Sequence, residues 1–157
     1  MLDTIVYDKA KYHYEGDFPE DLPIDQAFVH TGMFLGWIIE HHLFSEEFEE
    51  ESQDEIKQFK LRQMTGTEIY MNWDGVLADD MLNEEGNQFA MYYFNNDEKW
   101  KYISDYSDVF IDEETLYHVQ DTWENYFKLK DVIDNSYNFW KDNFQKKIIN
   151  KVDFLSQ

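Results

Sequence analysis

The chain has 157 residues and no cysteine, so disulfides, thiolate metal sites and cysteine nucleophiles are excluded, and its length suits one domain with a substantial core. Thirty-four acidic residues against thirteen basic ones give a formal net charge of −21, which disfavours nucleic acid and anionic lipid and favours a basic partner. Aromatic residues make up 18% of the chain, which indicates a packed core and not a disordered acidic polymer.

The first twenty residues combine aromatic and acidic side chains around the turn signal GDFP. We expect an ordered segment here, called the lead-in (residues 1–20), with one short helical turn near Lys9. Its beginning lacks the basic flank and the apolar core of a signal peptide, so a cytoplasmic protein is expected.

The stretch from Asp21 to Phe44 predicts a central helix, at about residues 24–43, that is apolar on nearly every side and therefore buried. Gly32 and Gly36 lie one turn apart in it. Their low helix propensity indicates a packing notch that another helix or a bulky aromatic ring approaches closely. The apolar run is too short to cross a bilayer, so no membrane association is expected.

A heavily acidic run follows the central helix, after Ser45, which is a good helix cap. Such a run is typical of a solvated helix face, but it would also suit a basic partner. We predict it to be the partner-binding surface. Its acidic residues are Glu46, Glu47, Glu49, Glu50, Glu51, Asp54 and Glu55.

Further helices are predicted from capping residues and apolar spacing. Thr65 and Glu68 have the spacing of a capping box, and Asn83 marks another helix start. Two helices are expected near the C-terminus, one opening at residues 121–122 and the last spanning about 131–149, whereas residues 115–119 suggest a short extended segment. The sequence therefore predicts a mainly α, bundle-like single domain over residues 1–157, around the buried central helix.

The histidines provide a second candidate site. His30 lies inside the apolar helix, where we expect a neutral ring bonded to a backbone carbonyl or to a carboxylate of the lead-in. The alternative is a small-molecule pocket between the lead-in and the central helix, lined by His13, Asp17, His30 and Trp37. Because the local sequence has neither metal-ligand spacing nor a catalytic motif, no catalytic residue, metal or cofactor is assigned.

Several sequence blocks resemble a family of uncharacterised bacterial proteins. They are the Tyr-Asp and His-Tyr pairs followed by GDFPEDLP, the block HTGMFLGW, and LNEEGNQFAMYYF with DTWENYFKLKDVIDNSYNFWK. The weakest stretch is 46–64. The resemblance brings no established activity and no catalytic residues. In size, acidity and stand-alone architecture the chain is also similar to immunity proteins that protect bacteria from secreted toxins, which is an analogy of type.

These observations favour a non-enzymatic acidic protein, an immunity protein that neutralises a cognate bacterial toxin by occluding its active site. The toxin would be basic, as many nucleases are. The alternative is a small-molecule-binding protein or enzyme that uses the pocket beside His30. A homodimer formed through the aromatic residues is a third reading.

Overall fold

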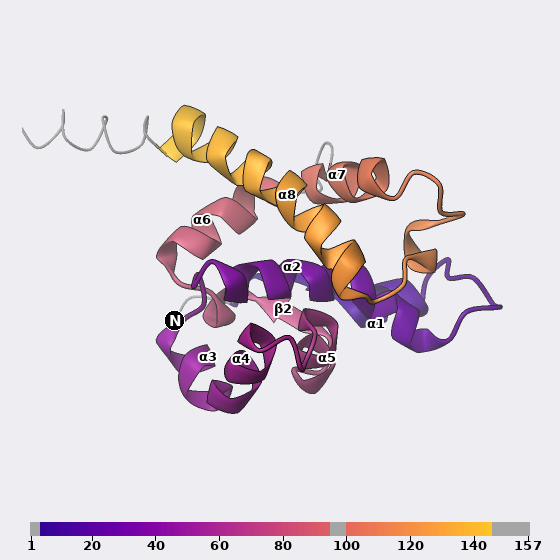
Figure 1. Ribbon diagram of the computed structural model, residues 1–157, viewed down its shortest axis with the longest axis horizontal. Helices are drawn as coiled ribbons and strands as arrows, with labels where there is room; N and C mark the ends of the chain where they lie inside the picture. The colour runs from indigo at the N-terminus through magenta and orange to yellow at the C-terminus, as the bar shows by residue number, and fades with distance from the viewer. Residues whose placement is uncertain (1–3, 95–99, 146–157) are drawn as a thin grey trace, which may run out of the picture.

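Helix α2 (Val29–Glu40) lies at the centre of the computed structural model, which describes residues 4–94 and 100–145 (Figure 1). Eleven of its 12 residues are buried, as expected for a helix that is apolar on every side. A 3-10 turn, η1 (Ile24–Phe28), leads into it, so the predicted central helix is a 3-10 turn followed by an α-helix. The helical run ends where His42 adopts a left-handed backbone conformation with φ 58°.

A two-stranded antiparallel sheet joins the lead-in to the middle of the chain. Strand β1 (Val6–Lys9) pairs with β2 (Val76–Ala78), with a bulge between Val6 and Asp8. Helix α1 (Ala10–Tyr14) follows β1 directly, which confirms the helical turn predicted near Lys9. Gly75 (φ 65°) makes the turn into β2, and its carbonyl accepts a hydrogen bond from the Ala10 amide at 2.8 Å.

Three short helices cover one side of α2: α3 (Glu46–Glu51), α4 (Gln53–Lys60) and α5 (Gly66–Asn72) (Figure 1). The predicted cap at Ser45 and the predicted capping box of Thr65 with Glu68 are both present. Helix α5 crosses α2 so closely that a Cβ on Gly32 would lie 2.5 Å from the Cα of Thr67. The packing notch predicted at the two glycines is therefore confirmed.

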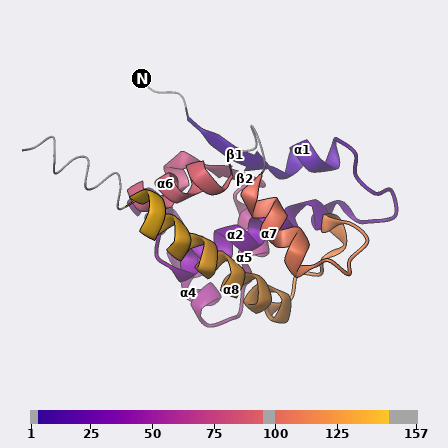
Figure 2. The same cartoon turned by 90° about the horizontal axis from the view of Figure 1, so that it is seen from above.

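The remaining helices lie against α2 from other directions (Figures 1 and 2). They are α6 (Glu84–Tyr93), which follows the 3-10 turn η2 (Asp79–Met81), then α7 (Lys101–Val109) and α8 (Trp123–Trp140), which continues into the π-helical turn η4 (Lys141–Gln145). The sequence predicted two separate C-terminal helices, and this is wrong within the described residues. Helix α8 runs through because residues 123–140 contain no glycine or proline to break it. Residues 146–149 of the predicted last helix lie outside the described residues.

The prediction of an extended segment at residues 115–119 is also wrong for the three central residues. Leu116–His118 form a 3-10 turn, η3. The turn forms because the hydroxyl of Thr115 accepts a hydrogen bond from the Tyr117 amide, and only Thr115 and Val119 on either side are extended.

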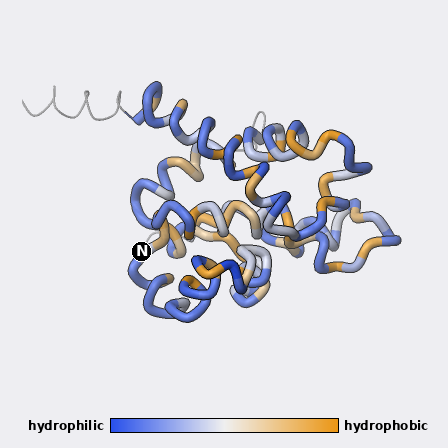
Figure 3. Tube along the Cα trace, in the orientation of Figure 1, coloured by the Kyte–Doolittle hydropathy of each residue, from blue (hydrophilic) through white to orange (hydrophobic). Residues whose placement is uncertain are grey.

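The molecule is mainly helical, as predicted, and its core is rich in aromatic rings. The largest fully buried side chains include Trp37, Tyr70 and Phe34. Figure 3 shows the hydrophilic segments on the outside, with long hydrophilic stretches along α3 and α4. Within the described ranges, no helix has both the length and the apolar character needed to span a bilayer.

Candidate functional site

One carboxylate and two imidazoles meet in the interior, between the lead-in and the central helix. His13 Nε2 lies 2.9 Å from Asp8 Oδ1 and 3.0 Å from Oδ2. The same nitrogen lies 3.2 Å from His30 Nε2, which is itself 3.5 Å from Asp8 Oδ2. We call these three residues the His–Asp cluster.

The fold explains why three residues that are separate in the sequence meet. Strand residues alternate in direction, and Asp8 is the position of β1 whose side chain is buried. Helix α1 then turns the chain back, which places His13 over the carboxylate. His30 and Thr31, in the first turn of α2, approach from the opposite side.

Further side chains hold the cluster in place. Thr31 Oγ1 donates a hydrogen bond to Asp8 Oδ2 at 2.6 Å, and His13 Nδ1 lies 2.8 Å from the hydroxyl of Tyr117. The Tyr102 hydroxyl donates to the backbone carbonyl of His30. The cluster therefore connects β1, α1, α2, η3 and α7.

Burial and hydrogen bonding fix the charges of the cluster. Burial alone would raise the pKa of Asp8, but hydrogen bonds from His13 and His30 hold this pKa well below its usual range. Burial lowers the pKa of His30, whose side chain is fully enclosed, and so keeps its ring neutral at physiological pH. Of the two partners expected for His30, a backbone carbonyl or a carboxylate of the lead-in, the Asp8 carboxylate lies 3.5 Å from its Nε2.

A cavity reaches the cluster at Asp8 and His13. It has a volume of about 460 Å³, and Trp100 also contributes to its wall. The side chain of His13 is 14% exposed, whereas that of His30 is 0% exposed. The Trp100 ring stacks over the His13 ring with centroids 6.2 Å apart. A molecule in this cavity would meet Asp8 and His13 first.

The four residues predicted to line a pocket fall in different places. His13 and His30 meet in the His–Asp cluster, but Asp17 lies exposed in the loop after α1. Trp37 lies about two helical turns beyond His30. There its indole donates to Asp134 Oδ1 at 2.9 Å.

A second histidine–carboxylate group surrounds this indole. His41 Nε2 lies 2.8 Å from Asp134 Oδ1, and Lys130 Nζ donates to Asp134 Oδ2 at 2.8 Å. With a single histidine and a single carboxylate, this group ties α8 to the end of α2.

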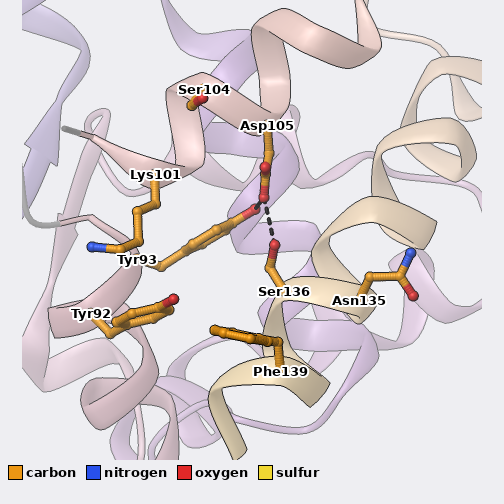
Figure 4. A pocket seen from close by; sticks show the side chains of 8 residues that line it. All are labelled: Tyr92, Tyr93, Lys101, Ser104, Asp105, Asn135, Ser136 and Phe139. Atoms are coloured by element: carbon orange, nitrogen blue, oxygen red, sulfur yellow. Dashed lines mark hydrogen bonds between the residues drawn. The ribbon is translucent and has the colours of Figure 1, made fainter. Parts of the chain in front are cut away.

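Another cavity, of about 360 Å³, lies among α6, α7 and α8 (Figure 4). At its centre Asp105 Oδ2 accepts hydrogen bonds from the Tyr93 hydroxyl and from Ser136 Oγ, each at 2.6 Å. The ammonium of Lys101 lies 4.6 Å from the centre of the Tyr92 ring. Because these polar groups are satisfied by one another, the arrangement is a link between helices.

The predicted acidic surface occupies α3 and the first turn of α4. All seven of its carboxylates belong to exposed or half-buried residues. Within the part of the chain that the structure describes, none of them forms an ion pair, and only Glu55 accepts a hydrogen bond, from Asn72 at 2.9 Å.

Sequence reasoning did not single out Asp8, Tyr117 or Trp100. Asp8 was one of many acidic residues in the lead-in, and the only available signal was its place in the Tyr-Asp block of the resemblance. Tyr117 and Trp100 come from η3 and from the residue before α7. No local pattern could have shown that these segments reach His13.

Comparison with known proteins gives a family but no activity. No curated protein matches the chain, and no solved structure does. The family model described as "Domain of unknown function (DUF7832)" matches residues 6–119. The match contains the whole His–Asp cluster and the acidic run, and it ends before the DTWENY block. The chain therefore belongs to the DUF7832 family, a family of unknown function.

Proposed function

We propose that this protein is a non-enzymatic binding protein whose acidic surface on α3 and α4 binds a basic partner protein, and that this partner is a bacterial toxin. The observation that carries the proposal is an apolar groove on the acidic helices α3 and α4, with the carboxylate of Glu49 in its wall. The groove has a volume of about 380 Å³ and is lined by Glu49, Gln53, Ile56, Lys57, Lys60 and Leu61.

The groove has the layout of a binding surface. Leu61 is 57% exposed and lines the groove together with the buried Ile56. Interfaces commonly combine an apolar centre with a polar or charged rim. Lys57 and Lys60 of α4 also line the groove, and Glu49 of α3 supplies the carboxylate in its wall.

The charge of the chain defines the chemistry of the partner. A net charge of −21 attracts a cationic protein over distances of about one Debye length, roughly 8–10 Å at physiological salt, and raises the rate of encounter. A cationic active-site cleft would be covered by the carboxylates while Leu61 anchors the centre. The toxin class rests on the similarity in size, acidity and stand-alone architecture to immunity proteins.

The test uses a toxin encoded beside this gene. We expect co-expression of this protein to restore growth of cells that produce the toxin. We also expect the triple variant Glu47→Gln, Glu50→Gln, Asp54→Asn to associate about tenfold more slowly with the purified toxin, with a weaker dependence on salt.

The matched control removes three charges elsewhere. Glu15→Gln, Glu20→Gln and Asp25→Asn are exposed positions of the lead-in and η1, so the net charge changes equally. Equal slowing in the two triple variants would show that only net charge matters and would refute the assignment to α3 and α4. Full rescue of growth by the α3–α4 variant, with unchanged association, would also refute it.

A second function is favoured by one specific observation, the cavity of about 460 Å³ that opens on Asp8 and His13. A small-molecule-binding protein or enzyme would use this cavity. Ligand-observed NMR against a metabolite library tests it. Binding should be lost in His13→Gln and retained in His41→Gln, and a library without binders to this cavity would contradict it.

A further inference from the structure

We propose that Asp8, His13 and His30 bind one divalent transition-metal ion, for which Zn²⁺ is the best-fitting ion. This inference goes beyond the binding function proposed above and does not depend on it. It rests on the positions of the three donor atoms, on the side chains behind them and on access from the cavity.

The three donor atoms already have the spacing of ligands around one ion. Each residue offers one donor atom, and these atoms all lie within 4.8 Å of one another. The contacts between His13 Nε2, His30 Nε2 and the Asp8 carboxylate measure 2.9–3.5 Å. Ligands bonded at about 2.0–2.2 Å lie about 3.0 Å apart in octahedral geometry and about 3.4 Å apart in tetrahedral geometry. An ion fits with movements of a few tenths of an ångström.

Every protonation state of His30 leaves its buried Nδ1 without a partner among the described residues, so hydrogen bonding does not by itself select one arrangement of the two rings. If both Nε2 atoms carry protons, both N–H groups point toward the Asp8 carboxylate, at 2.9 Å from His13 and at 3.5 Å from His30, and the two nitrogens lie only 3.2 Å apart. If His30 carries its proton on Nδ1 instead, that buried N–H has no partner among the described residues. If neither Nε2 carries a proton, two lone pairs face the carboxylate. A cation between the three groups turns this last repulsive arrangement into the favourable one.

Side chains around Asp8 and His13 orient these two donors as in known metal sites, whereas His30 Nδ1 has no partner among the described residues. Metal-bound histidines usually donate their other ring N–H to an oxygen, and metal-bound carboxylates accept a further hydrogen bond. His13 Nδ1 can donate to the Tyr117 hydroxyl at 2.8 Å, and Thr31 donates to Asp8 at 2.6 Å. His13 and Asp8 therefore have the second-layer partners that a ligand needs.

The donor set decides the class of metal. Two imidazoles and one carboxylate suit Zn²⁺ and its first-row neighbours, whereas Mg²⁺ and Ca²⁺ prefer oxygen donors alone. Among the described residues three protein donors converge, which leaves a further coordination position for a non-protein ligand. Since Asp8 and His13 line the cavity, water or a small ligand can reach that position.

The experiment uses the full chain after treatment with a chelator. Titration with Zn²⁺ is followed by calorimetry in an excess of Mg²⁺, which occupies the acidic surface. We expect one ion per chain. Titration with Co²⁺ should produce visible absorption bands of a low-symmetry, nitrogen-containing site.

Matched variants locate the ion. His13→Gln and Asp8→Asn should each weaken Zn²⁺ binding by about 100-fold or more, and Tyr117→Phe by about 10–100-fold, because it removes only a partner of a ligand. His41→Gln, in the other histidine–carboxylate group, should leave binding unchanged. Circular dichroism confirms that each variant is folded, and His13→Gln remains informative if Asp8→Asn is not, because His13 is partly exposed.

Three results would overturn the proposal: no stoichiometric binding of Zn²⁺, unchanged affinity in folded His13→Gln, or equal loss of affinity in His41→Gln. The first two leave partner binding by α3 and α4 untouched. Loss of partner binding in the α3–α4 variant, in turn, does not affect Zn²⁺ binding, so the two proposals fail separately.

Discussion

Gly66 is the residue at which α5 meets α2, and the contact leaves no room for a side chain. A Cβ there would lie 2.4 Å from the Gly32 carbonyl oxygen and 2.6 Å from the Gly36 amide nitrogen, both of which are backbone atoms. Gly66→Ala should therefore push the two helices apart and destabilise the fold by about 3 kcal/mol, the upper part of the usual range for overpacking. Urea denaturation measures this loss.

Gly36→Ala is the matched control. Its Cβ would first meet the edge of the Phe59 ring at 3.0 Å, and alanine also gains up to about 1 kcal/mol of helix propensity over glycine. We expect a clearly smaller loss than in Gly66→Ala. Equal losses in the two variants would show that the backbone contact at Gly66 is not the decisive one.

The carboxylate of Asp134 contributes to the stability of the fold in a pH-dependent way. Burial tends to raise its pKa, but hydrogen bonds from Lys130, Trp37 and His41 lower it overall. Because the pKa of Asp134 is lower in the folded state than in the unfolded state, its ionised form stabilises the fold fully at pH values above the pKa of the unfolded state. This stabilisation is lost as the pH falls through the pKa of the folded state.

Asp134→Asn should therefore cost about 1 kcal/mol at neutral pH, a modest figure because the carboxylate is partly exposed to solvent. The difference in stability between this variant and the wild type should become smaller at acidic pH. Thermal unfolding between neutral and acidic pH checks this, with exposed Asp131→Asn on the same helix as the control. A difference that grows as the pH falls would contradict the assignment.

At the scale of elements, Thr65 has two tasks. Its hydroxyl accepts the Glu68 amide at the start of α5 and donates to Asp121 Oδ2 at 2.7 Å, which links α5 to the segment before α8. Thr65→Ala should cost about 1 kcal/mol of folding stability for the cap and about 1 kcal/mol more for the bond to the half-buried carboxylate of Asp121.

Thr122→Ala provides the comparison, because among the described residues the Thr122 hydroxyl bonds only to the Asn125 amide at the start of α8. We expect it to cost about 1 kcal/mol, measured in the same denaturation series. Equal costs for Thr65→Ala and Thr122→Ala would show that the link to Asp121 contributes nothing.

Local signals account for what the sequence predicted at this scale. The buried central helix, the notch at its glycines and the caps at Ser45, Thr65 and Asn83 all depend on residues within a few positions of one another. The β1–β2 sheet was missed because its strands have four and three residues and pair across a long separation.

The sequence predicted two of the three residues of the His–Asp cluster, His13 and His30, but not Asp8. His13 and His30 could be proposed to face each other because a turn separates the lead-in from the central helix. Asp8 reaches them only because the bulge in β1 and the register with β2 aim its side chain inward. That register is a tertiary property, so no local pattern reveals it.

The net charge of −21 acts on the whole molecule, since 34 carboxylates repel one another over distances that salt can screen. Surface ion pairs contribute at most about 1 kcal/mol each and weaken with salt, so the sign of the salt response shows which effect is larger. We expect repulsion to dominate. Raising NaCl from roughly 0.01 M to roughly 0.5 M should increase stability by about 1 kcal/mol, or about 2–4 °C in Tm.

A charge-reversed variant separates this effect from general salt effects on proteins. Glu47→Lys, Glu50→Lys and Asp54→Lys change the net charge by +6, from −21 to −15. The variant should start with a higher Tm at low salt and gain less from added NaCl, because part of the repulsion is already gone. An equal gain in both proteins would mean that salt acts through solvent exclusion. The acidic face on α3 and α4 would then carry no electrostatic strain that a basic partner could relieve.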